Sequence, residues 1–172
     1  LLGLLSISLA ACESGGGNGD DDEEEEQQGF PEPPGRPGFT SSFTGTVSLS
    51  VSGAALHGAN LASGDGGAPR AFAIRLADEA ARARETRIVL ASARVAVPRP
   101  GVYAVGAPAD GPDFTAWVTL PGRPLPLRAT AGTLEVLDRA GDTLAGRFRL
   151  EVSDAPGGPL AVSGAFRSTA AP

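Results

Sequence analysis

Apolar and polar residues alternate with a period of two in several segments of the chain after Phe39. This alternation is typical of β-strands with one buried and one exposed face. The clearest segments carry the apolar sets Val47, Leu49 and Val51; Phe72, Ile74 and Leu76; Phe114, Ala116, Val118 and Leu120; Phe148, Leu150 and Val152; and Val162, Gly164 and Phe166. Further strands are expected at 87–97, 102–106 and 132–138.

Clusters of Gly, Pro and Asp separate these segments, at 63–67, 98–101, 140–142 and 154–159. Such clusters favour turns. Short strands at this spacing, polar on one face, predict an all-β domain over 39–172. We expect an antiparallel β-sandwich of about seven to nine strands, with a β-barrel as the alternative.

One segment departs from the strand pattern. Residues 77–87 are rich in helix formers, but only Ala fills their apolar positions, so we expect a short surface helix or a charged loop there. A second feature is an internal echo, since Gly146-Arg147-Phe148-Arg149 resembles Gly164-Ala165-Phe166-Arg167. We interpret it as two similar strand starts rather than as a duplicated domain.

The composition restricts the chemistry. The 172 residues include one Cys, one His and 14 basic residues, all of which are Arg. This length suits one domain. A single Cys and a single His exclude an intrachain disulfide and a zinc cluster, and the absence of Lys excludes Schiff-base chemistry and a phosphate-loop Lys. No cofactor is expected.

The charge of −6 is unevenly spread. Residues 1–38 hold nine acidic residues and one Arg, whereas residues 39–172 hold 11 acidic residues and 13 Arg. The acidity therefore belongs to an N-terminal tail, and the predicted domain is nearly neutral. No basic cluster with interleaved aromatic residues is present, so nucleic acid is not an expected partner.

The N-terminal segment has features of a signal that directs a protein to a membrane. An apolar run of about ten residues is too short to span a bilayer, but it suits the core of a secretory signal. Its end, Leu9-Ala10-Ala11-Cys12, resembles the lipobox of bacterial lipoproteins. The alternative is an ordinary signal peptide or a buried helix with an incidental Cys.

The resemblance implies that the signal is cut before Cys12 and that this Cys carries lipid, including palmitate. Residues 1–11 would then be the remnant of a signal peptide that begins further upstream. Because several acyl chains hold a protein firmly on a bilayer, the membrane is an expected partner through Cys12. In this family Asp after the Cys favours the inner membrane, so Glu13 favours the outer membrane, on either its periplasmic or its surface face.

Residues 12–38 are expected to form a disordered tether. They combine a Gly-rich stretch, seven consecutive acidic residues at 20–26 and a Pro-rich stretch at 30–38. Acidic runs repel themselves, and Pro-rich segments favour extended polyproline II. We expect a spacer rather than a calcium site, because the run lacks the alternating ligands and turn Gly of a calcium loop.

The sequence gives little support for a catalytic function. The only His, His57, is expected at a loop or a strand end, and no Gly-x-Ser-x-Gly motif accompanies it. The acidic residues Asp110, Asp113, Glu135 and Glu151 are scattered, so a carboxylate pair or a metal site is not predicted. We do not expect an enzyme.

An interaction surface is the remaining hypothesis. Arg147, Arg149 and Arg167 alternate on the outward faces of the last two predicted strands, and Trp117 lies opposite the apolar face of its own strand. The arginines are expected to contact an acidic envelope protein or polymer, or else to keep the sheet soluble. Trp117 is expected either to belong to the core of a second layer or to form an exposed platform for a ligand. The sequence thus predicts a non-catalytic binding module on a lipid anchor. The alternatives are a lipocalin-like carrier of small ligands and, third, an enzyme of unrecognised type.

Overall fold

A computed structural model describes residues 29–59, 61, 71–78, 85–107, 111–154 and 158–172. These residues form nine β-strands and no helix. The strands are β1 (Gly38–Gly45), β2 (Leu49–Gly58), β3 (Phe72–Ala77), β4 (Arg87–Ser92), β5 (Gly101–Gly106), β6 (Thr115–Thr119), β7 (Leu127–Ala140), β8 (Thr143–Asp154) and β9 (Gly158–Ala170).

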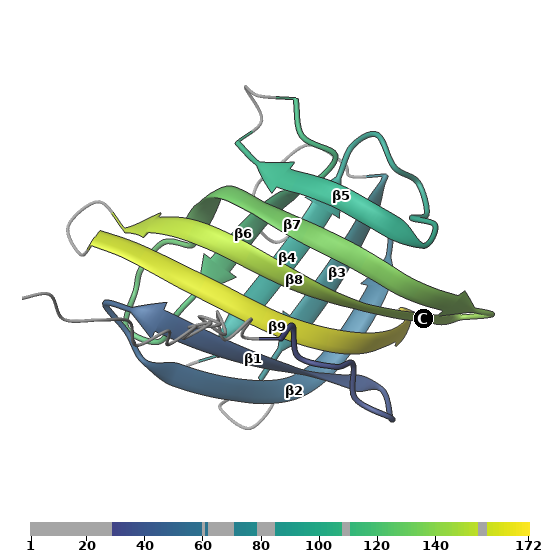
Figure 1. Cartoon of the computed structure of the whole chain (residues 1–172), viewed down its shortest axis with the longest axis horizontal. Helices are drawn as coiled ribbons and strands as arrows, with labels where there is room; N and C mark the ends of the chain where they lie inside the picture. Colours follow the sequence, from purple (N-terminus) through teal and green to yellow (C-terminus); the bar gives the residue numbers. More distant parts are fainter. Residues whose placement is uncertain (1–28, 60, 62–70, 79–84, 108–110, 155–157) are drawn as a thin grey trace, which may run out of the picture.

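Eight of these strands close into a barrel (Figure 1). The ring runs β1-β2-β3-β4-β6-β7-β8-β9 and returns from β9 to β1, with antiparallel pairing at every step. β5 is the additional strand, and it pairs with residues 131–136 of β7 beyond the short contact between β6 and β7. The all-β prediction is confirmed. The strands form a closed barrel, the alternative that the sequence analysis gave to a sandwich.

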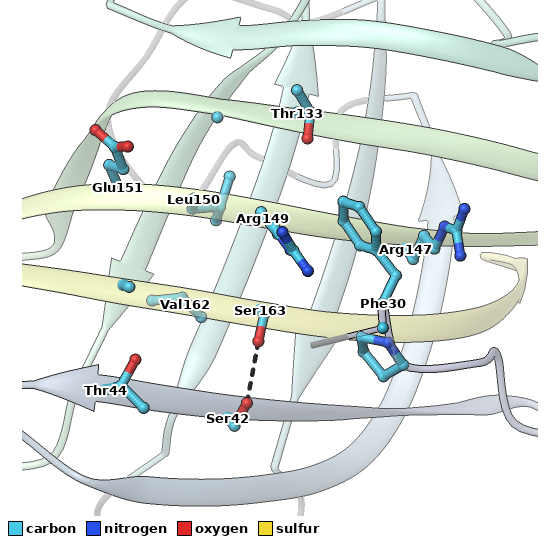
Figure 2. A pocket seen from close by; sticks show the side chains of 14 residues that line it. Phe30, Ser42, Thr44, Thr133, Arg147, Arg149, Leu150, Glu151, Val162 and Ser163 are labelled. Carbon is cyan, nitrogen blue, oxygen red and sulfur yellow. Dashed lines mark hydrogen bonds between the residues drawn. The ribbon is translucent and has the colours of Figure 1, made fainter. Parts of the chain in front are cut away.

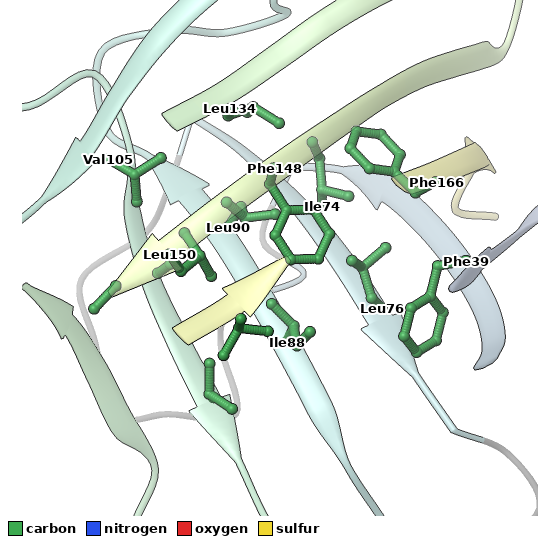
Figure 3. Packing of buried hydrophobic residues seen from close by; sticks show 14 of the residues in the cluster. Phe39, Ile74, Leu76, Ile88, Leu90, Val105, Leu134, Phe148, Leu150 and Phe166 are labelled. Atoms are coloured by element: carbon green, nitrogen blue, oxygen red, sulfur yellow. The ribbon is translucent and has the colours of Figure 1, made fainter. Parts of the chain in front are cut away.

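The barrel interior is filled by side chains. Most apolar positions of the alternating pattern are almost completely buried, including Phe72, Phe114, Phe148 and Phe166 at 2% exposure or less. Val47 and Leu49 are only partly buried, and Val47 precedes β2. Figure 3 shows aromatic and aliphatic side chains from opposite walls meeting in this space. An eight-stranded barrel is just narrow enough for side chains to fill it.

The internal echo in the sequence has a structural meaning. β8 and β9 pair so that Phe148 lies opposite Gly164 and Gly146 lies opposite Phe166. A Cβ atom on Gly164 would lie 2.6 Å from Cζ of Phe148, and one on Gly146 would lie 2.8 Å from Cζ of Phe166. Each phenylalanine ring therefore occupies the space above the glycine of the other strand, an arrangement known to compensate for glycine in sheets.

Local contacts explain where one predicted strand ends, and backbone conformation explains one predicted turn. The strand expected at 87–97 ends at Ser92, whose Oγ accepts hydrogen bonds from the backbone N–H groups of Arg94 (3.1 Å) and Val95 (2.9 Å). The turn expected at 140–142 joins β7 to β8, and Gly141 takes the left-handed conformation there, with φ of 57°. That conformation is readily available to glycine.

Two predictions fall largely outside the described residues. The helix or charged loop expected at 77–87 is described only at its ends: Ala77 closes β3, Arg87 opens β4, and the N–H of Asp78 donates to the carbonyl of Thr86. The signal remnant at 1–11, Cys12 and the first part of the tether, to residue 28, also lie outside them.

Candidate functional site

The three predicted arginines lie on the outer wall of the barrel. Arg147 and Arg149 belong to β8 and Arg167 to β9, on the face opposite to the buried phenylalanines. Strand pairing arranges the outward residues in rows that cross β7, β8, β9 and β1. One row reads Glu135, Arg147, Ala165 and Thr40, and the next reads Thr133, Arg149, Ser163 and Ser42.

These rows explain why the outer wall has a groove. Along each row, the arginine on β8 is followed on β9 and β1 only by short side chains. The surface is therefore lower beside the two guanidinium groups. The resulting open groove has a volume of about 1190 Å³ (Figure 2). Besides the two arginines it is lined by Gly29, Phe30, Pro31, Ser42, Thr44, Gly132, Thr133, Leu150, Glu151, Ala161, Val162 and Ser163.

The Pro-rich segment crosses this wall. We refer to residues 29–37 as the strap, because they lie along the outside of the barrel before β1 begins at Gly38. The Phe30 ring lies beside both arginines, with its centroid 4.6 Å from Cζ of Arg147 and 3.9 Å from Cζ of Arg149. Both distances allow cation–π attraction. The strap, which the sequence analysis assigned to the tether, thus contacts the barrel through Phe30.

A second contact holds the strap further along. The Nε–H of Arg167 donates a hydrogen bond of 2.9 Å to the carbonyl oxygen of Pro34. The strap contains four prolines, whose fixed φ angles leave little conformational entropy to be lost on docking. All three predicted arginines therefore contact the chain's own strap.

Arg147 has an additional partner in the wall. Its Nε lies 2.6 Å from Oε2 of Glu135, and the two side chains are 29% and 27% exposed. This ion pair balances the charge of Arg147 and fixes its side chain next to the Phe30 ring. The carboxylate of Glu151 also lines the groove, so the acidic and basic side chains of this wall are interleaved.

Trp117 does not join the arginines. It lies half-buried on the outer face of β6, where it packs against a small cluster formed by Ala73, Val89 and Ala91 on β3 and β4. Leu61 packs against the same cluster, and Cζ of Arg128 lies 5.8 Å from the centroid of the Trp117 ring. The structure thus divides the predicted surface into the groove with its three arginines and a separate apolar cluster on another wall.

His57 lies near the end of β2, as expected, and contacts a buried serine. Its Nδ1 is 2.9 Å from Oγ of Ser168, and this Oγ in turn donates to the carbonyl oxygen of Leu144 at 3.2 Å. Since the single hydroxyl proton is committed to Leu144, Nδ1 of His57 is the donor to Ser168. Burial, and then the charge of Arg139, lower the pKa of His57, although the charge of Asp142 and a hydrogen bond with the backbone of Ser168 act in the opposite direction.

The contact between His57 and Ser168 has a structural role. Ser168 is completely buried, so no substrate reaches its hydroxyl oxygen. The backbone closes the same corner, because the N–H of Ala171 donates to the carbonyl of His57 at 2.8 Å. The contacts join the end of β2 to the end of β9, where the two strands run parallel for two residue pairs.

The acidic candidates are separated as well. Asp113 accepts a hydrogen bond from the N–H of Ala104, Glu135 pairs with Arg147, and Glu151 lies in the groove. Asp110 is outside the described residues. Within the described part of the chain, no three His, Cys, Asp or Glu side chains lie close enough together to hold a metal ion.

Sequence reasoning missed the contribution of the strap and of the short side chains beside the arginines. Phe30 was assigned to a spacer, although an aromatic residue at the start of a Pro-rich stretch is a recognisable docking signal. The alternation of Ala161, Ser163 and Ala165 also marks an outward strand face with little bulk.

Comparison with known proteins gives no family assignment: no protein-family model matches the chain, and no curated protein or solved structure is significantly similar to it. Among the described residues, no helix is long and apolar enough to cross a membrane.

Proposed function

We propose that this chain is a lipid-anchored lipoprotein of the bacterial cell envelope that presents its barrel as a non-catalytic interaction module. The lipobox-like sequence ending at Cys12 supports the anchor. The residues between Cys12 and the strap space the barrel from the bilayer, and their acidic run is repelled by anionic headgroups. Glu13 after the Cys favours the outer membrane.

The observation that carries the binding role is the groove on the outer wall. Two guanidinium groups stand at its side, and its lining offers hydroxyl groups from Ser42, Thr44 and Ser163. Guanidinium groups recognise carboxylates, phosphates and aromatic faces. A partner with acidic or aromatic groups, such as an envelope protein or an anionic polymer, suits this lining.

The interior of the barrel supports a carrier role much less. Carriers built on small barrels keep an apolar cavity inside. Here five phenylalanines with less than 2% exposure fill that space, whereas the groove of about 1190 Å³ lies on the outer wall beside the strap. This arrangement favours a binding site on the wall.

Replacement of the lipidated residue tests the anchor. Cys12→Ala is expected to abolish labelling with radioactive palmitate and to leave the protein uncut or soluble. Wild-type protein should label and sediment with the outer membrane. If the Cys12→Ala protein still incorporated palmitate and remained membrane-bound, the anchoring proposal would be wrong.

Charge removal in the groove tests the binding role. The Arg147→Gln/Arg149→Gln double variant is expected to lose components that wild-type protein retains from solubilised envelope. The matched control is Arg87→Gln/Arg128→Gln, which removes the same charge from other strands. Equal retention by all three proteins would contradict binding through the groove.

A further inference from the structure

Four residues of β8 and β9 form a square on the outer wall. Arg147 lies opposite Ala165, and Ala145 lies opposite Arg167, so the two arginines stand on one diagonal and the two alanines on the other. All four face outward, because residues two apart on a strand share a face. Both alanines are nevertheless buried, with 0% exposure for Ala165 and 3% for Ala145. A methyl group on an outer wall is buried only where another part of the molecule covers it.

The strap supplies this cover together with the arginine side chains. The centroid of the Phe30 ring lies 4.6 Å from Cζ of Arg147, and the carbonyl oxygen of Pro34 accepts the hydrogen bond from Arg167. These arginines occupy opposite corners of the square. The chain between Phe30 and Pro34 therefore crosses the square and lies over the two alanines.

The strap itself is attached only loosely. Phe30, Pro31, Pro33 and Pro34 are half-buried, and its other five residues are exposed. None of these nine residues belongs to a strand. Cation–π contacts and single hydrogen bonds are weak at this exposure, and a segment with so little buried surface has low local stability. The strap can therefore detach while the barrel remains folded.

Pro31 separates two hollows of the wall. The groove and a smaller hollow of about 310 Å³ both have Pro31, Ser42 and Ser163 in their linings. The smaller hollow extends over Ser50 and Ser52 of β2. Removal of the strap from this position joins the two hollows into one trough that crosses β8, β9, β1 and β2.

The last part of the strap provides a pivot. Gly35, Arg36 and Pro37 are exposed, and a Cβ atom added at Gly35 would have no neighbour within 4 Å. The chain is fixed again at Gly38, where β1 begins and pairs with β9. Glycine permits large changes of backbone angle at low cost. Residues 35–37 can therefore rotate while β1 stays in the barrel.

We propose that the strap is a lid over this wall. In the closed state the Phe30 ring covers the two guanidinium groups of the groove, as Figure 2 shows, and Pro31 divides the two hollows. In the open state the strap turns about residues 35–37, both alanines are exposed, and the trough is continuous. A partner that binds through the guanidinium groups then competes with the Phe30 ring. This last consequence rests on the proposed function, whereas the opening of the lid does not.

Thiol alkylation measures the opening of the lid. The full chain with Cys12→Ser has no other cysteine, so Ala165→Cys introduces a single thiol beneath the strap. Phe30→Ala removes both cation–π contacts and should raise the rate of alkylation by iodoacetamide about five- to 25-fold, since each exposed contact changes an equilibrium about two- to fivefold. Phe30→Tyr keeps the ring and should leave the rate within about twofold of its original value.

Ala73→Cys is the matched control on another wall. Ala73 has 0% exposure and lies on β3 in the separate apolar cluster with Trp117. Its rate should be unchanged by Phe30→Ala. Equal rates at position 165 with and without the Phe30 ring, or an equal rise at position 73, would overturn the lid. Ala145→Cys carries the same prediction as Ala165→Cys and replaces it if that variant does not fold.

Urea separates the opening of the lid from unfolding of the barrel. The detachment of nine residues exposes little surface, so the rate at position 165 should change little with urea below the unfolding transition. A steep rise with urea in this range would mean that alkylation requires unfolding of the barrel, and the lid would be refuted.

Retention of envelope components distinguishes the lid from the proposed function. Phe30→Ala should retain more of these components than the wild type, and Arg147→Gln/Arg149→Gln should retain fewer. If the arginine variant loses retention while Phe30→Ala equals the wild type, the lid does not control binding. If all three proteins retain the same components and alkylation follows the prediction, the proposed function fails and the lid stands.

Discussion

The Phe148 ring lies over the backbone of Gly164 on the neighbouring strand, so a Cβ atom there would be only 2.6 Å from Cζ of the ring. The same Cβ would lie 2.6 Å from the carbonyl oxygen of Thr40 on β1. One side of this space is a ring in the core and the other is backbone. Gly164 therefore joins three strands of the barrel in a way that no larger residue allows.

This packing predicts a large effect for a single methyl group. Gly164→Ala should destabilise the barrel by about 1–3 kcal/mol, because neither the backbone of β1 nor the packed ring yields easily. The measurement is the midpoint of urea unfolding. Gly58→Ala is the control, since a Cβ there meets its nearest atom at 3.6 Å, and it should change the midpoint little. Equal effects of the two substitutions would contradict the packing argument.

The inward face of β1 contains a polar exception. Ser41 lies between Phe39 and Phe43, is 6% exposed, and its Oγ has no hydrogen-bond partner among the described residues. A buried hydroxyl without a partner costs free energy. Ser41→Ala should therefore stabilise the protein by about 1 kcal/mol in thermal or urea unfolding. A loss of stability would show that the hydroxyl has a partner in solution.

The buried contact of His57 with Ser168 predicts that the stability of the protein depends on pH. Its pKa in the folded protein is lowered from 6.5, so between the two values the unfolded chain binds more protons than the folded one. Its contribution to stability is therefore complete above pH 6.5 and is lost as the pH falls through the lowered pKa. Urea midpoints measured from about pH 7.5 to about pH 5 should show this decline.

His57→Asn supplies the comparison for that experiment. The amide of Asn can place a donor near Oγ of Ser168, but it does not titrate in this range. Subtracting the pH profile of the variant from that of the wild type isolates the contribution of His57. If the two profiles are parallel, the lowered pKa of His57 has no part in stability.

The strap predicts a local rather than a global effect. Phe30→Ala removes the ring that Arg147 and Arg149 contact, so the strap should move more freely while the barrel remains folded. Backbone order parameters of Glu32 and Gly35 should fall below about 0.6, from about 0.85 in the wild type. Phe30→Tyr keeps the ring and should keep the order. Unchanged order in the Ala variant would show that the ring does not hold the strap.

The strands with strict apolar alternation could be predicted from the sequence, because their inward residues are large and apolar. β3 and β6 are examples: their inward residues are buried as expected, namely Phe72, Ile74, Leu76, Ala116 and Val118. β1 was not predicted, because Ser41 interrupts its apolar face. The second half of β2 was also missed, since residues 53–58 are mostly Gly and Ala and have little hydrophobic contrast.

Closure of the barrel could not be predicted from alternation alone. A sandwich and a barrel place the same residues on the buried face, and they differ only in which distant strands pair. Here the pairing of β1 with β9 joins the two ends of the domain, for example Phe39 with Phe166. Nothing in either short segment specifies that partner.

The candidate site was predicted in part. Alternation around Phe148 placed Arg147 and Arg149 outward, which is correct, and the same pattern placed Arg167 on the same wall. The groove itself depends on which short side chains lie beside the arginines on β9 and β1, and on the strap crossing the wall. Both depend on long-range pairing, which local sequence patterns do not contain.

Site-specific photo-crosslinking in intact cells tests the central claim, that the anchored barrel binds through its outer groove. A photoreactive residue at Ser163 lies in the groove, and one at Thr119 on β6 lies outside it. The account predicts crosslinked envelope components from position 163, fewer of them after Arg149→Gln, and none from position 119. The absence of crosslinks from position 163, or equal crosslinking from both positions, would contradict it.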